Sequence, residues 1–169
     1  MSREIIIAAA QMGPNLKEAS QEATVARMVA LLNKAAARGA QLVVFPELAL
    51  TTFFPRWFME NQTEIEEFFE TEMPSSLVEP LFRRAKELGI AFTFGYAEKC
   101  LIGGQIRRFN TSIMVGVEGD ILSHYRKIHL PGHIEHEPWR AFQHLEKRYF
   151  EPGEDFYRTT ELLGSKFSM

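Results

Sequence analysis

Gln41 to Leu48, with the sequence QLVVFPEL, is an apolar run that ends close to a carboxylate. Its centre, Leu42–Phe45, holds four consecutive apolar residues with β-branching, which predicts a strand buried on both faces. Glu47 follows where this strand leaves the sheet. Because open α/β sheets place their ligand sites at the carboxyl ends of strands, Glu47 is a candidate general base. The alternative is a solvated acid that opens a loop.

The residues before this run predict a βαβ unit. Ile5–Met12 is typical of a buried strand closed by a Gly-Pro turn. Lys17–Arg38 carries apolar residues at helical spacing, and Gly39 is the expected end of that helix. A strand, a helix and a second strand in this order predict that the two strands are parallel.

Helix and strand signals also follow Glu47. Thr63 with Glu66, and Ser76 with Glu79, form two capping boxes that predict helix starts. The period then becomes extended, and glycine-containing turns separate three predicted strands: Ile90–Cys100, Arg107–Val117 and Ile121–Ile128. The predicted fold class is α/β, a layered arrangement with a mixed sheet and helices on one face.

Composition limits the function classes. The chain has 169 residues, of which 46% are hydrophobic and 24% charged, as in one ordinary globular domain. A net charge of -3 argues against a nucleic-acid partner. We expect no membrane span, because no apolar segment is long enough. The N-terminal apolar run lacks a convincing cleavage site, and a single cysteine fits a reducing compartment, so the expected location is cytoplasmic.

A cation occupies a position that matches that of Glu47. The segment HYRKIHLP, residues 124–131, places Lys127 near the end of the last predicted strand. If both strands end at one edge of the sheet, a carboxylate and an ammonium group meet in a partly dry cleft. In acyl transfer the acid would move protons while the cation stabilises the oxyanion. The alternative is a structural salt bridge or a surface basic cluster.

Several other polar or aromatic residues are candidates for a site. Pro131 and Gly132 interrupt the helical spacing that a metal site would need, so we predict no metal there. Glu146 is either a second functional acid or a solvated one. Possible metal ligands near Lys127 are His129, His133, His136 and Glu137. The aromatic residues after Glu47 predict a satellite core, with a substrate-facing wall as the alternative: Phe53, Phe54, Trp57 and Phe58.

Four segments resemble the nitrilase superfamily of carbon-nitrogen hydrolases, and within it the N-carbamoyl-D-amino acid amidohydrolases: VVFPELALTTFFPRW, NTSIMV, HYRKIHLPGH and FQHLEKRYFEPG. The resemblance runs from about Arg3 to about Phe156. Residues 1–156 are therefore expected to be an incomplete carbon-nitrogen hydrolase domain, and residues 157–169 a divergent tail. The resemblance implies the N-terminal part of an α-β-β-α sandwich, a homo-oligomer, and no metal or organic cofactor.

The resemblance also implies roles for individual residues. By it, Glu47 is the general base and Lys127 the oxyanion stabiliser of a Glu-Lys-Cys triad. Glu146 matches an additional acid of the family, while His129 and His144 match histidines that support the site. The implied substrate is a small N-carbamoyl-D-amino acid, which is hydrolysed to the D-amino acid, ammonia and carbon dioxide.

The nucleophile of that triad has no match in the sequence. The family places its cysteine after the EPG segment, Glu151–Gly153, whereas the one cysteine here, Cys100, precedes Lys127 and is expected to be structural. Without the nucleophile, a base and a cation give only weak electrostatic stabilisation of the transition state. We therefore expect a truncated form with little or no turnover. The alternatives are a catalytically silent module that binds a partner through its uncovered apolar face, or a fragment of another amidase of the superfamily.

Overall fold

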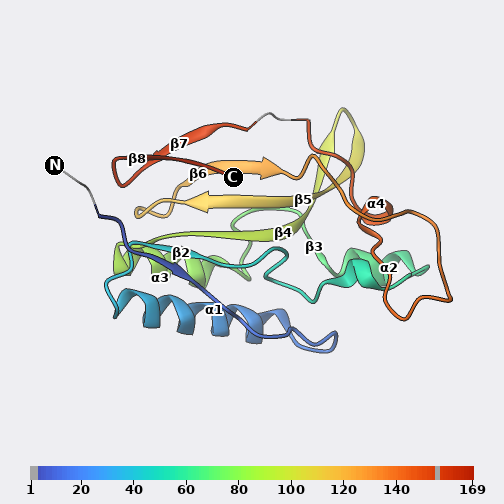
Figure 1. The fold of residues 1–169 in the computed structure, drawn as a ribbon, viewed down its shortest axis with the longest axis horizontal. Coiled ribbons are helices and arrows are strands. Elements are labelled where there is room, and N and C mark those ends of the chain that lie inside the picture. The colour runs from blue at the N-terminus through green and yellow to red at the C-terminus, as the bar shows by residue number, and fades with distance from the viewer. Residues whose placement is uncertain (1–3, 155–156) are drawn as a thin grey trace.

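A six-stranded mixed sheet forms the centre of the protein (Figure 1). The computed structural model describes residues 4–154 and 157–169, and the expected domain end at residue 156 lies outside them. The described elements are, in order, β1 (Ile7–Ala9), α1 (Gln21–Ala36), β2 (Leu42–Val44), η1 (Phe54–Arg56), α2 (Gln62–Glu66), β3 (Phe69–Glu70), α3 (Glu79–Leu88), β4 (Ala91–Ile102), β5 (Gln105–Val115), β6 (Ile121–Arg126), α4 (Glu146–Tyr149), β7 (Thr159–Leu162) and β8 (Ser165–Ser168).

The strand order of the sheet is β1-β2-β4-β5-β6. The short strand β3 pairs with β4 at Ala97 and Glu98, beyond the residues of β4 that pair with β2. The pair β1 and β2 is parallel, as predicted, and so is the pair β2 and β4. The predicted meander is confirmed, because β4, β5 and β6 pair antiparallel. Its first turn is the predicted glycine turn: Gly103 and Gly104 both take positive φ, 58° and 80°, and these two residues close the hairpin between Ile102 and Gln105.

The helices α1 and α3 cover one face of the sheet (Figure 1), which confirms the predicted layering. Alternate strand residues point into this layer, where they pack on helix residues such as Met28 and Leu81: Val43, Phe92, Phe94, Ile113 and Val115. The opposite face meets the β7–β8 hairpin, which packs on Leu42, Ala91 and Met114. The hairpin lies within the tail that we expected to be divergent.

The burial predicted for three strand residues is wrong: Ile6 is 44% exposed, and the other two, Ile7 and Val44, lie on that second face. Val44 was expected to be buried, yet it is 39% exposed, because the hairpin covers only part of the face. Ile7 is 51% exposed, because β1 is the edge strand and the hairpin does not reach it. The run Leu42–Phe45 therefore packs fully on the helix side and only partly on the other.

Helix starts also differ from the sequence patterns. Neither predicted capping box forms: the Asn61 side chain caps α2 by accepting a hydrogen bond from Thr63 N at 3.0 Å, and α3 begins after Val78 without a side-chain cap. Helix α1 begins at Gln21 rather than Lys17, because Ser20 is its N-cap. No helix in the described part of the chain has the length and hydropathy of a membrane span.

A second cluster of apolar residues lies beside the loop that follows Glu47. Phe54 is fully buried and stacks on Phe68, with 4.6 Å between ring centroids. Tyr149 joins this loop to α4, since its hydroxyl donates to Trp57 O at 2.6 Å and accepts from Met59 N at 2.8 Å. The predicted satellite core is confirmed, and it places α4 next to the loop after β2.

Candidate active site

Glu47 lies in a turn that presses against the middle of β4. Strand β2 ends at Val44, and the chain then crosses Gly95, whose N donates to Pro46 O at 3.3 Å and whose carbonyl accepts from Ala49 N at 2.7 Å. These bonds continue the sheet pairing past the end of β2. The carboxylate is thereby held at the carboxyl end of a parallel strand, as the sequence predicted.

Gly95 is required for this close approach, which leads to a prediction for Gly95→Ala. A β-carbon there would lie 2.8 Å from Leu48 N and 3.1 Å from Glu47 Cα, so the backbone carrying Glu47 must move. We expect the free energy of unfolding, measured with urea, to fall by about 1–3 kcal/mol. Gly116→Ala is the matched control, because a β-carbon at Gly116 meets only side-chain atoms of Leu122 and Asp120. Equal losses in the two variants would contradict the prediction.

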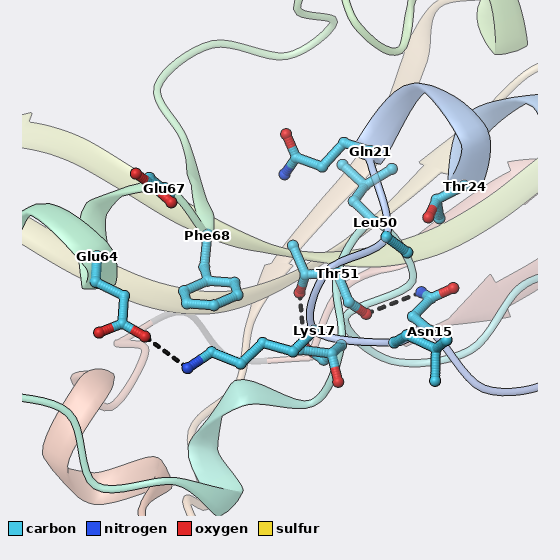
Figure 2. A pocket seen from close by; sticks show the side chains of 12 residues that line it. Asn15, Lys17, Gln21, Thr24, Leu50, Thr51, Glu64, Glu67 and Phe68 are labelled. Atoms are coloured by element: carbon cyan, nitrogen blue, oxygen red, sulfur yellow. Dashed lines mark hydrogen bonds and ion pairs between the residues drawn. The ribbon is translucent and has the colours of Figure 1, made fainter.

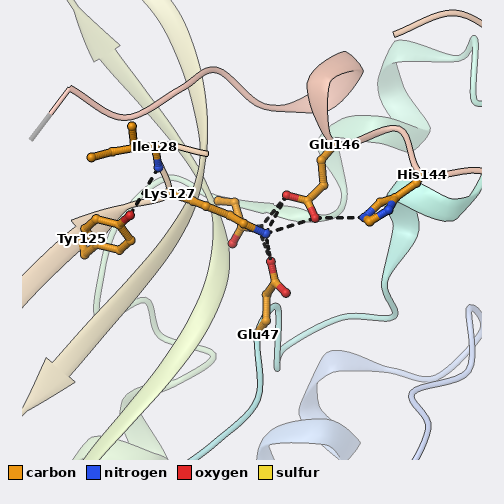
Figure 3. Close-up of polar contacts among 7 residues, drawn as sticks. Glu47, Tyr125, Lys127, Ile128, His144 and Glu146 are labelled. Atoms are coloured by element: carbon orange, nitrogen blue, oxygen red, sulfur yellow. Dashed lines mark hydrogen bonds and ion pairs between the residues drawn. The ribbon is translucent and has the colours of Figure 1, made fainter. Parts of the chain in front are cut away.

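Lys127 stands directly after β6 and reaches Glu47 across the sheet. Its backbone N donates to Asn110 O at 2.8 Å, and its backbone O accepts from Gly153 N at 2.9 Å. The Lys127 Nζ donates to Glu47 Oε1 at 2.7 Å and to Glu146 Oε2 at 2.9 Å (Figure 3). Burial disfavours the charged amine, but the hydrogen bonds to Glu47 and Glu146 raise the pKa of Lys127 above its ordinary value. The cation is therefore charged at neutral pH.

Glu146 is the most deeply buried member of this group, with 1% of its surface exposed. It opens α4, and its Oε1 lies 3.3 Å from His144 Nε2 (Figure 3). His144 also packs edge-on against Phe53, with 5.8 Å between the rings. Gly132 allows this placement, because a β-carbon there would lie 1.8 Å from His144 O. Glu146 is thus a paired, buried acid, and the solvated alternative is excluded.

The group opens onto a cleft of about 400 Å³ on the second face of the sheet. His129 lines this cleft beside Lys127 and Tyr125. The structure thus brings Glu47, Lys127, Glu146 and His144 into one contact network, and it places His129 on the cleft wall. The cleft residues are Phe45, Pro46, Glu47, Gly95, Asn110, Ser112, Tyr125, Lys127, His129 and Tyr157.

One residue of the network was not singled out from the sequence. Asn110 is 4% exposed, and its Nδ2 donates to Glu47 Oε1 at 2.6 Å and to Glu146 Oε2 at 3.5 Å. The available signal was a run of three polar residues, Asn110-Thr111-Ser112, between Phe109 and Ile113 of a predicted strand. A buried polar residue in such a strand needs hydrogen-bond partners, and here the partners are the two carboxylates.

Cys100 lies away from the cleft. It follows Gly95 by five residues along β4, which corresponds to about 16 Å of strand. Its Sγ is 3.3 Å from Arg126 Nη2, and burial together with the nearby Glu98 carboxylate raises the pKa of the thiol. A thiol that stays protonated and faces another network is not the nucleophile of this cleft, in agreement with its expected structural role.

A separate pocket of about 300 Å³ lies beside the start of α1 (Figure 2). Two of its three charged residues pair with each other, since Lys17 Nζ donates to Glu64 Oε1 at 2.6 Å, and Glu67 is the third. Asn15 Nδ2 donates to Ala49 O at 3.0 Å and to Thr51 O at 2.9 Å. The Asn15 side chain therefore stabilises the loop that follows Glu47.

Comparisons with known proteins identify the family of the chain. The family model described as carbon-nitrogen hydrolase matches residues 6–169. A nitrilase of Pyrococcus abyssi is 30% identical over 156 residues, which cover 92% of this chain and 51% of that protein. An omega-amidase of Xenopus tropicalis is 31% identical over 141 residues, covering 77% of this chain and 42% of the other. The chain spans about half the length of the curated relatives it matches.

Solved structures show the same fold. An amidase from Nesterenkonia sp. AN1 superposes with a TM-score of 0.73 at 22% identity, over 98% of this chain and 56% of that one. A carbon-nitrogen hydrolase from Helicobacter pylori G27 gives a TM-score of 0.70 at 20% identity, over 96% and 49% of the two chains. Since the family model covers nearly the whole sequence, the chain belongs to the carbon-nitrogen hydrolases of the nitrilase superfamily.

Proposed function

We propose that this chain supplies the base and the cation of an amide-hydrolysing site, and that its substrates are N-carbamoyl-D-amino acids. The observation that carries the proposal is the Lys127 ammonium, held between Glu47 at 2.7 Å and Glu146 at 2.9 Å in a cleft. Glu47 keeps 48% of its side chain exposed and so can meet a reactant. Glu146 is buried, and its role is to hold Lys127 in place as the charged oxyanion stabiliser.

The reaction also needs a nucleophile, and Cys100 does not face the cleft. A solved structure of a Nesterenkonia amidase mutant shows covalent addition at the active-site cysteine of that protein. We propose the same nucleophile here, supplied by a part of the family domain beyond these residues. Its thiol loses a proton to Glu47, and the sulfur attacks the carbonyl carbon. The C–N bond breaks as Glu47 returns the proton to the leaving nitrogen, and water then cleaves the acyl-sulfur bond.

The substrate class is supported by the four segments that resemble the carbamoyl amidohydrolases. The cleft volume of about 400 Å³ suits a small molecule. The matched relatives are described as a nitrilase and omega-amidases, so nitriles and side-chain amides are the competing classes. The three classes differ in the group attacked, and a panel of substrates separates them.

The test is ammonia release by the protein isolated from the cells that make it. Its intact mass is first compared with the 19.4 kDa of this sequence. The panel holds an N-carbamoyl-D-amino acid, its L enantiomer, a dicarboxylic acid ω-amide and a nitrile. We expect ammonia from the D compound at a rate at least about tenfold above the L compound. Equal rates for both enantiomers would refute the substrate class. A cysteine-containing larger form that acts on none of the four would refute amide hydrolysis.

A second candidate function is an assembly module without turnover. It is favoured by the partly uncovered face of the sheet, where Ile7 is 51% and Val44 39% exposed. A partner would bind there through apolar contact. Size-exclusion chromatography of the 169-residue chain tests this, since a stable monomer with no tendency to associate would count against it.

A further inference from the structure

Asn110 lies between Glu47 and Lys127 in the candidate active site. It lies in the middle of β5, which pairs with β4 on one side and β6 on the other. Its side chain donates to Glu47 Oε1 at 2.6 Å, while its backbone carbonyl accepts from Lys127 N at 2.8 Å. One buried residue therefore contacts both the acid and the backbone that carries the cation.

The contacts of Glu47 are unequal between its two oxygens. Both hydrogen bonds that it accepts within residues 4–154 and 157–169 fall on Oε1, from Asn110 Nδ2 at 2.6 Å and from Lys127 Nζ at 2.7 Å. The side chain nevertheless remains 48% exposed. Oε2 accepts no hydrogen bond from the described residues, so it is the oxygen left free to take a proton.

We propose that Asn110 is a positioning residue, which holds Glu47 by Oε1 so that Oε2 is the atom that takes the proton. A carboxylate bound to a lysine alone can rotate and exchange its oxygens, because the lysine side chain is long and flexible. A short amide side chain on a central strand removes that freedom. The amide donates without gaining or losing a proton at neutral pH, so it does not compete with Glu47 as an acid. The inference rests on the proposed function for the role of Glu47 as base.

The test is an NMR titration of the 169-residue chain, with ¹³C in the glutamate carboxyl groups and the Glu47 signal assigned through Glu47→Gln. Asn110→Ala removes a hydrogen bond that favours the ionised form, so the pH midpoint of the Glu47 signal should rise by about one unit. Asn110→Asp also places a like charge beside Glu47, and a rise of about two units is expected. Asn33→Ala is the matched control on α1, where Asn33 pairs with Arg84, and it should leave the midpoint unchanged.

A midpoint that moves by less than about 0.2 of a unit in folded Asn110→Ala would overturn the proposal. If that variant does not fold, the unaltered chain gives the answer. The side-chain amide signals of Asn110 should shift with the same midpoint as the Glu47 carboxyl, and their independence of pH would overturn the proposal equally. The titration needs no turnover. A protein that shows these shifts but releases no ammonia would therefore support the hold on Glu47 while refuting the proposed function.

Discussion

Glu47→Gln is expected to lower kcat/KM for ammonia release by about 10³-fold or more, in the form of the protein that turns over. A general base contributes about 10²–10⁴-fold, and the glutamine amide cannot accept the proton. The change keeps the shape of the side chain and leaves an oxygen for Lys127 Nζ, which lies 2.7 Å from Glu47 Oε1. The loss would thus report proton transfer rather than packing.

Lys127→Ala tests the other half of the same site. Removing one group that stabilises an oxyanion costs about 10²–10³-fold in kcat. It also leaves the buried carboxylate of Glu146 without its cation at 2.9 Å. We therefore expect kcat to fall by about 10²–10³-fold, together with a lower unfolding midpoint.

The control for both variants is Glu64→Gln. Glu64 is a partly exposed acid that pairs with Lys17 at 2.6 Å beside the other pocket (Figure 2). It has the same charge and a similar partner, but it does not line the cleft. Its rate should equal that of the unaltered protein. A wild-type rate in Glu47→Gln would refute the role of Glu47 as base.

Arg126→Met is expected to lower the free energy of unfolding by about 3 kcal/mol. Glu98 is 8% exposed and receives two hydrogen bonds from Arg126, at 2.8 and 2.6 Å, and one from Thr111 at 2.6 Å. Removing one partner of a buried pair costs about 3–5 kcal/mol, because the remaining charge is left unpaired. We use the lower value because Arg126 keeps 21% of its side chain exposed. Urea unfolding at neutral pH measures the loss.

The pH dependence of the free energy of unfolding shows whether the loss in Arg126→Met comes from the charge of Glu98. Burial opposes ionisation of Glu98, yet the hydrogen bonds from Arg126, His124 and Thr111 hold the pKa of its carboxyl well below the ordinary value of 4.5. A lowered pKa in the folded state stabilises the protein above pH 4.5, and this stabilisation is lost as the pH falls below that value. The unaltered chain should therefore lose stability on acidification, and Arg126→Met should show a flatter curve.

The double variant Arg126→Met, Glu98→Gln shows how much of the loss in stability comes from the unpaired Glu98 charge and how much from lost packing. Removing the carboxylate as well should restore part of the stability, because no unpaired charge remains buried. A double variant as unstable as Arg126→Met at neutral pH would show that the network contributes through packing rather than charge.

Part of the fold could be predicted because it depends on short-range periodicity. The extended character of β4 and β5, the helical spacing in α1 and the glycine turns are properties of neighbouring residues. Helix starts could not be predicted in the same way. Thr63 and Ser76 had suitable spacing, but Asn61 caps α2 and Val78 precedes α3, because the path of the incoming loop decides which residue reaches the helix end.

Burial on the second face could not be predicted from the sequence either. The apolar character of Val44 and Ile7 is a local property, whereas their exposure depends on how far the β7–β8 hairpin extends over the sheet. That extent is a long-range property of packing, and no pattern within either segment reports it.

The sequence by itself determined the superfamily, and it placed an acid and a cation each just after a strand, because each of these is specified by a contiguous segment. Only the tertiary structure decided that Lys127 Nζ, 80 residues beyond Glu47, lies 2.7 Å from its carboxylate. It also decided that Asn110 donates a hydrogen bond to that carboxylate, and that Gly95 lets the Glu47 backbone pack closely on β4. The physical reason is that a local pattern specifies the type of an element, whereas strand order and register across the sheet specify which side chains meet.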